Sequence, residues 1–114
     1  MEVVLNNLKK VSEIENLDVY ILSLARSFII VEEKKQWLKK YAPFIREENY
    51  ILLNKENGDY NAENREFIKS IKMMEKLNEY DYVILLDDDH KILKRTLNEI
   101  GKNGEVFHVS SATM

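Results

Sequence analysis

Residues 82–89, Tyr-Val-Ile-Leu-Leu-Asp-Asp-Asp, join a short apolar run to three consecutive acids. An apolar run of this length, rich in branched and aromatic side chains, is typical of a buried β-strand. In open α/β sheets, ligands bind beyond the carboxyl ends of the strands, where these acids would lie. Adjacent carboxylates suit a hard cation such as Mg²⁺. The segment therefore predicts a cation or phosphate site at the end of strand 82–86.

The three acids also have an interpretation that needs no ligand. Asp88 or Asp89 would cap the helix that follows, by accepting hydrogen bonds from its first backbone N–H groups. One cap explains one aspartate and not three, so we favour the ligand site and keep the cap as the alternative.

The rest of the chain alternates between helical and extended patterns. Apolar residues at helical spacing predict four helices, over about residues 2–16, 30–41, 62–78 and 92–100. Short apolar runs predict four strands, at residues 19–22, 50–53, 82–86 and 106–109. This order predicts an α/β fold, a three-layer αβα domain with a short, mostly parallel sheet of about four strands. We expect residues 1–114 to form this single domain, with Trp37 packed between a helix and the sheet.

Composition excludes several classes of protein. The chain has 114 residues, no cysteine and a net charge of −3. Disulfides, thiolate metal sites and a cysteine nucleophile are therefore excluded, and the acidic balance argues against a nucleic-acid partner. The apolar runs are too short to span a membrane, and the first residues lack the charged segment of a signal peptide. We expect a cytoplasmic protein without a membrane partner.

Polar residues follow the predicted strands. Ser23 follows the first strand, Lys55 the second, and Asp87 and Asp88 the third. Because the carboxyl ends of parallel strands share one edge of a sheet, we expect these groups to converge. The hydroxyl and the amine would hold phosphate oxygens, and the carboxylates would hold Mg²⁺. The set contains no activated nucleophile.

Three segments together resemble the haloacid dehalogenase-like phosphatases, most closely their deoxyribonucleotidase-type members. They are residues 20–23 (Tyr-Ile-Leu-Ser), residues 33–43 (Glu-Lys-Lys-Gln-Trp-Leu-Lys-Lys-Tyr-Ala-Pro) and residues 84–88 (Ile-Leu-Leu-Asp-Asp). The resemblance implies that Asp88 is a Mg²⁺ ligand, Asp87 its supporting carboxylate and Ser23 a phosphate contact. It also implies a phosphorylated substrate such as a nucleoside monophosphate.

The family's third motif is a phosphate-binding lysine, and two residues match it. Lys55 fits by its place after the second strand, and Lys69 fits by its place on the helix before the acidic strand. We favour Lys55.

The chain departs from this family in its first motif. An Asp-x-Asp pair normally supplies the nucleophile, and none precedes Ser23. Without that aspartate, a phosphatase of this type cannot form its aspartyl-phosphate intermediate. The resemblance covers about residues 19–110 and implies an incomplete domain, without the first strand and the cap, that is weakly active or inactive alone.

The missing strand would leave a gap in the sheet. Either the strand of Ser23 pairs directly with the acidic strand, or a second copy or a partner chain fills the gap, because unpaired backbone in a core is costly. The chain would then be a non-catalytic interaction module that uses an exposed sheet edge. A further alternative is a permuted receiver domain, since residues 83–111 resemble the opening strand, helix and strand of a response-regulator receiver.

Overall fold

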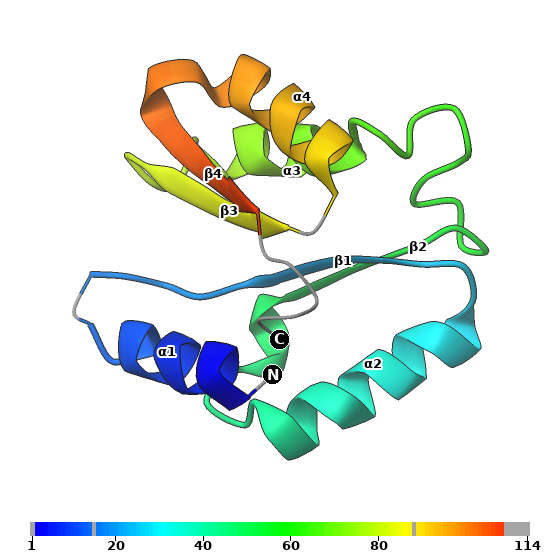
Figure 1. Cartoon of the computed structure of the whole chain (residues 1–114). Coiled ribbons are helices and arrows are strands. Elements are labelled where there is room, and N and C mark those ends of the chain that lie inside the picture. Colours follow the sequence, from blue (N-terminus) through cyan, green and yellow to red (C-terminus); the bar gives the residue numbers. More distant parts are fainter. Residues whose placement is uncertain (1, 15, 88, 109–114) are drawn as a thin grey trace. The chain divides into compact units, whose positions relative to one another are not determined.

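A computed structural model describes residues 2–14, 16–87 and 89–108 (Figure 1). Helices and strands alternate along the chain, which confirms the predicted mixed α/β class. The elements are α1 (Glu2–Ser12), β1 (Ile21–Ala25), α2 (Phe28–Tyr41), β2 (Tyr50–Asn54), α3 (Ile68–Lys76), β3 (Val83–Asp87), α4 (His90–Ile100) and β4 (Gly104–His108), with 3₁₀ turns at Glu47–Asn49 and Gly101–Asn103. Among the described residues, no helix has the length and apolar character needed to cross a membrane.

The chain forms two compact units that meet in the sequence between Tyr60 and Asn61. In the first unit, β1 pairs in parallel with β2; in the second, β3 pairs in parallel with β4. The predicted parallel pairing is thus confirmed, but the described strands form two sheets of two strands each and not the one sheet of about four strands that the sequence predicts. The three-layer arrangement and the single domain over residues 1–114 stay predictions.

The core of the first unit lies between α2 and its sheet. Leu38, Ala42 and Ile45 are buried together, and Ile21 and Tyr50 pack against them. Ser27 begins α2, because its hydroxyl oxygen accepts a hydrogen bond from the backbone N–H of Ile30. This cap adds residues before the predicted start at Ile30, so the observed helix begins at Phe28.

The first strand corrects the prediction for Ser23. We expected Ser23 to follow a strand over residues 19–22, but it lies in the middle of β1, paired in register with Leu52. The apolar residues Leu24 and Ala25 continue the ladder beyond it, opposite Leu53 and Asn54. A single serine does not end a strand whose neighbours on both sides keep their partners.

Two helices are shorter than predicted. Helix α1 ends at Ser12, ahead of the predicted residue 16. Helix α3 begins at Ile68 and not near residue 62, because two asparagine side chains hold the preceding turns. The amide oxygen of Asn61 accepts hydrogen bonds from the N–H groups of Glu63 and Asn64, and that of Asn64 accepts one from Asn61. Such side-chain bonds compete with helical hydrogen bonding.

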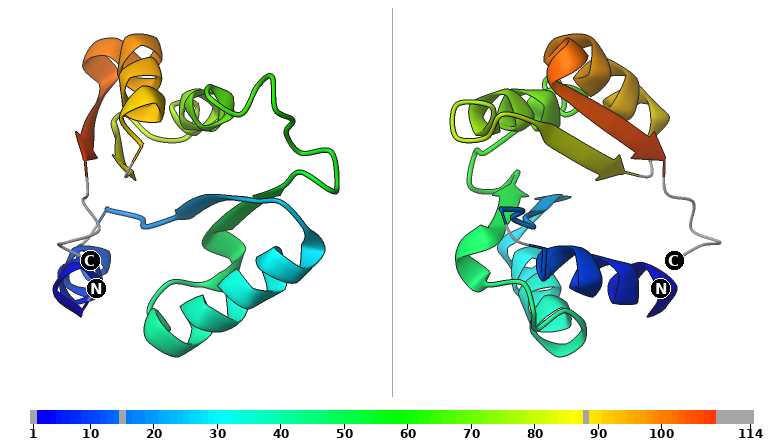
Figure 2. Two further views of the ribbon diagram at one scale, coloured as in Figure 1. Left: turned by 45° about the vertical axis from the view of Figure 1, so that its right-hand side comes forward. Right: turned by 90° about the vertical axis from the view of Figure 1, so that its left-hand side faces the viewer.

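In the second unit, α3 and α4 cover one face of the β3–β4 sheet (Figure 2). Val83 and Leu85 are buried on the covered face, while Ile84 and Leu86 on the opposite face are exposed. Gly104 approaches Val83 so closely that a side chain there would overlap the carbonyl oxygen of Val83. This approach explains why glycine stands at the start of β4.

Candidate functional site

The Ser23 hydroxyl is in contact with a lysine from α2. Ser23 shares a face of β1 with Ile21, which packs against α2, so its side chain also points toward that helix. Its Oγ accepts a hydrogen bond from the Lys34 Nζ at 2.5 Å, and the same Nζ donates to the carbonyl oxygen of Leu24 at 2.6 Å. Ser23 and Lys34 are both half-buried.

Lys34 is a residue that the sequence-based assignment of the site missed, although it lies in the helix that carries the family resemblance. The spacing of residues along the helix could have identified Lys34. Lys34 stands four residues before Leu38, which stands four residues before Ala42, and both of these are buried. Residues at this spacing share one face of a helix. Lys34 therefore lies on the face of α2 that packs on the sheet, where its ammonium reaches β1.

This pair has the chemistry of an anion contact. Because the Ser23 oxygen accepts the hydrogen bond from Lys34, its own hydrogen points away from the ammonium and is able to donate to another acceptor. The ammonium supplies positive charge beside that donor. Hydrogen bonds from charged groups to phosphate oxygens are among the stronger ones in proteins.

Lys55, the favoured phosphate lysine, directly follows β2 and is exposed. Its backbone N–H donates to the carbonyl oxygen of Ala25 at 2.9 Å and so extends the β1–β2 ladder. Among the described residues, the lysine in contact with Ser23 is Lys34. The phosphate role of Lys55 stays a prediction.

In the second unit, the acidic strand end is paired with the other candidate lysine. Asp87 is the last residue of β3, and its Oδ2 lies 2.5 Å from the Nζ of Lys69 on α3. The two side chains are almost fully buried, with 5% of Asp87 and 11% of Lys69 exposed. The other oxygen, Oδ1, accepts a hydrogen bond from the backbone N–H of Asp89 at 3.0 Å.

Asp89 is the N-cap of α4, so the capping alternative is confirmed for this residue. Its Oδ1 accepts hydrogen bonds from the N–H groups of Lys91 at 2.9 Å and Ile92 at 3.3 Å. Asp88, which the resemblance makes the Mg²⁺ ligand, lies outside the described residues. The three acids thus divide into an ion-pair partner, an undescribed residue and a helix cap.

Both carboxylate oxygens of Asp87 have partners within the protein. One oxygen is held by an ammonium and the other by a backbone N–H. Within the described part of the chain, no three acidic or histidine side chains gather as a metal site would require. The predicted roles of Asp87 and Asp88 at a Mg²⁺ site stay predictions.

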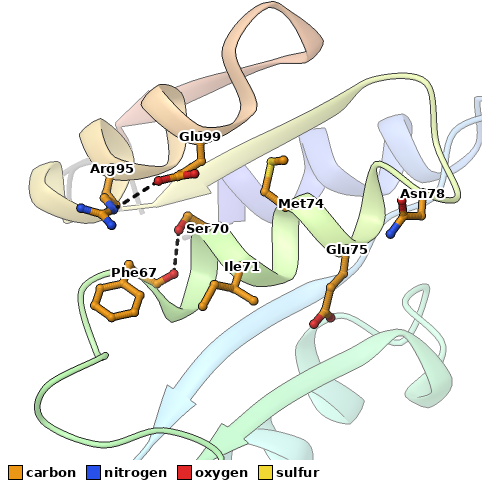
Figure 3. Close-up of a pocket in the computed structure, with 8 residues that line it drawn as sticks. All are labelled: Phe67, Ser70, Ile71, Met74, Glu75, Asn78, Arg95 and Glu99. Carbon is orange, nitrogen blue, oxygen red and sulfur yellow. Dashed lines mark hydrogen bonds and ion pairs between the residues drawn. The ribbon is translucent and has the colours of Figure 1, made fainter.

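A separate groove lies between α3 and α4, with a volume of about 530 Å³ (Figure 3). Some of its lining residues contact one another. Arg95 lies over the ring of Phe67 and 3.6 Å from Glu99, and the Ser70 hydroxyl donates to the carbonyl oxygen of Phe67. Among the described residues, none of the predicted site residues lines this groove, whose lining is Phe67, Ser70, Ile71, Met74, Glu75, Asn78, Arg95 and Glu99.

Comparison with known proteins identifies no family, since no protein-family model, curated protein or solved structure matches the chain. The resemblance to haloacid dehalogenase-like phosphatases therefore stays a prediction. Its three segments correspond to β1, α2 and the end of β3, and two lysine contacts are found on them, Lys34 with Ser23 and Lys69 with Asp87.

Proposed function

We propose that the chain is a phosphatase-related domain of the haloacid dehalogenase-like type that binds a phosphorylated small molecule, such as a nucleoside monophosphate, through Ser23 and Lys34. The observation that carries this proposal is the hydrogen bond between the Lys34 ammonium and the Ser23 hydroxyl at 2.5 Å. We also propose that the chain has the three-layer αβα fold of that family, without its first strand and its cap.

Several features support Ser23 and Lys34 as the phosphate contact. The ammonium is held in place by the Leu24 carbonyl as well as by Ser23, so little further ordering of the lysine is needed when an anion binds. Both side chains are half-buried, which strengthens their electrostatic interaction with an anion compared with fully exposed groups. A nucleoside monophosphate would present its phosphate to the hydroxyl and the ammonium.

The domain alone has little or no phosphatase activity in this proposal. Chemistry of this type needs an aspartate nucleophile ahead of the serine, and no Asp-x-Asp pair precedes Ser23. Turnover of a deoxynucleoside monophosphate that is abolished by Asp88→Asn would contradict this statement. Mg²⁺ enters the proposal only through Asp88, the residue that the resemblance makes its ligand.

Isothermal titration with inorganic phosphate tests the binding proposal. We expect saturable binding by the wild type, with losses of about tenfold or more in Ser23→Ala and Lys34→Met, because each change removes one charge-assisted contact. Lys35→Met is the matched control, since Lys35 is the next residue of α2 and makes no contact with Ser23 among the described residues. Equal affinity in all four proteins would refute the role of Ser23 and Lys34.

One observation favours a second candidate, a non-catalytic interaction module that recruits a second copy or a partner chain. β3 exposes Ile84 and Leu86, with 51% and 46% of their surface accessible. Each β-sheet in the described residues has only two strands, and strand edges are sites for pairing with another chain. Light scattering at high concentration tests self-association, and a strict monomer would count against it.

A further inference from the structure

Asp87 has both carboxylate oxygens engaged by groups of the protein itself. The Lys69 ammonium lies 2.5 Å from Oδ2, and the Asp89 backbone N–H donates to Oδ1 at 3.0 Å. With 5% of the Asp87 side chain exposed, water contributes little to its stabilisation. A buried carboxylate needs a matching charge and hydrogen-bond donors, and this one has both.

These contacts link three elements of the second unit. Lys69 belongs to α3, Asp87 ends β3, and Asp89 is the cap of α4. Asp87 accepts a hydrogen bond from the backbone N–H of Asp89. The carboxylate of Asp89 in turn accepts hydrogen bonds from the N–H groups of Lys91 and Ile92 in the first turn of α4. A continuous series of contacts therefore joins Lys69, Asp87 and the start of α4.

A divalent ion on Asp87 would compete with this arrangement. Mg²⁺ binds oxygen ligands at short distance in a near-octahedral shell, so on Asp87 it would lie beside the Lys69 ammonium, a like charge. Repulsion between such neighbours is strong where water is largely excluded.

We propose that the Lys69 ammonium takes the place of a metal ion at Asp87, so that Asp87 is a positioning residue for the start of α4 and not a Mg²⁺ ligand. The proposal does not rest on phosphate binding by Ser23 and Lys34, which belong to the other unit. It also differs from the family resemblance, which makes Asp87 part of a metal site.

A Mg²⁺ titration of the whole chain, followed by the NMR signal of the Asp87 side-chain carboxyl carbon, tests the proposal. In the wild type we expect this signal to stay unchanged through millimolar Mg²⁺. In Lys69→Met the carboxylate loses its cation, and we expect a saturable change over the range of Mg²⁺ concentration in which the wild type shows none. Lys72→Met is the control, because Lys72 lies on the same helix and pairs with the more exposed Glu75. We expect it to behave like the wild type.

The double variant Lys69→Met/Asp87→Asn removes both charges and is expected to fold without a Mg²⁺ response. If this double variant gains the same response as Lys69→Met, the ion binds elsewhere and the proposal is overturned. A saturable change of the Asp87 signal with Mg²⁺ in the wild type overturns the proposal directly. A Lys69→Met variant that folds but whose Asp87 signal does not respond to Mg²⁺ overturns it as well. A wild-type change confined to Asp88 supports it. If Lys69→Met does not fold, the wild-type titration alone decides.

Discussion

The Lys34 ammonium lies 2.5 Å from the Ser23 hydroxyl oxygen and 2.6 Å from the Leu24 carbonyl oxygen. One side chain of α2 thus holds both a side chain and a backbone group of β1. The contact joins the helix to its strand and places a positive charge next to a hydroxyl. Its structural and binding roles are separable by experiment.

The structural role predicts a stability effect of Lys34→Met. The change leaves the Leu24 carbonyl and the Ser23 hydroxyl without this donor, and a half-buried polar group that loses its partner costs about 1–2 kcal/mol. We expect a decrease of that size in the free energy of unfolding, measured by urea denaturation. Lys35→Met should change stability less. The same loss in both variants would mean that the contact with β1 contributes nothing specific.

Asp89→Ala is expected to weaken the start of α4. It removes the acceptor for the N–H groups of Lys91 and Ile92, and loss of an N-cap costs about 1 kcal/mol. Hydrogen exchange should become faster at these two amides. Asp89→Asn keeps a capping oxygen without the charge, so it should protect them nearly as well as aspartate does. Exchange unchanged in Asp89→Ala would show that the cap does not hold the helix end.

Thr96→Val is expected to stabilise the second unit. Thr96 on α4 is fully buried, and its hydroxyl finds no hydrogen-bond partner among the described residues. Burying such a group costs roughly 1–3 kcal/mol, and valine has nearly the same shape without the hydroxyl. Thermal unfolding should therefore occur at a higher temperature in Thr96→Val and at a lower one in Thr96→Ala, which leaves a cavity. If Thr96→Val unfolds at a lower temperature than the wild type, the Thr96 hydroxyl has a hydrogen-bond partner.

The ion pair between Lys39 and Glu47, 2.8 Å long, predicts a pH effect. A hydrogen bond from Lys39, and then its charge, lower the pKa of Glu47 below its usual 4.5. A carboxyl group with a lowered pKa stabilises the fold above its unfolded pKa, and this contribution is lost as the pH falls through the folded value. A carbon NMR titration should show a low midpoint for Glu47 that rises in Lys39→Met. An unchanged midpoint would show that the two groups do not interact in solution.

The same contact acts in the opposite direction on the lysine. Glu47, first by a hydrogen bond and then by its charge, raises the pKa of Lys39 above 10.5. That contribution to stability is complete below the unfolded pKa of the lysine and is lost as the pH rises through the folded value. In Glu47→Gln, the NMR-detected midpoint of Lys39 should fall toward its usual range.

The order of helices and strands was predictable from the spacing of apolar residues, because that spacing reflects which side chains of each element are buried. The spacing is clear in this chain. Element boundaries are less predictable, because side-chain hydrogen bonds decide them. Ser27 extends α2 and Asn61 delays α3, and neither effect alters the apolar pattern. Trp37 was wrongly expected in the core: its ring lies 5.1 Å from that of Tyr41, and 38% of its surface is exposed.

The candidate site was predictable only in part. A run of acids after an apolar strand marks a special strand end, and Asp89 as a cap was among the alternatives. The lysine partners were harder to assign, because several lysines compete and only tertiary packing selects among them. Lys34 reaches Ser23 because it shares a helix face with Leu38, and Lys69 reaches Asp87 because it is buried against β3.

The most direct test of the proposed function is the change in backbone amide NMR signals when inorganic phosphate is added to the wild-type chain. We predict saturable shifts centred on Ser23 and Leu24, reproduced by a deoxynucleoside monophosphate and absent with the unphosphorylated nucleoside. Signals of Ser23 and Leu24 that stay unchanged up to saturating phosphate, or that respond equally to the nucleoside, would contradict the assignment of Ser23 and Lys34 as a phosphate-binding pair.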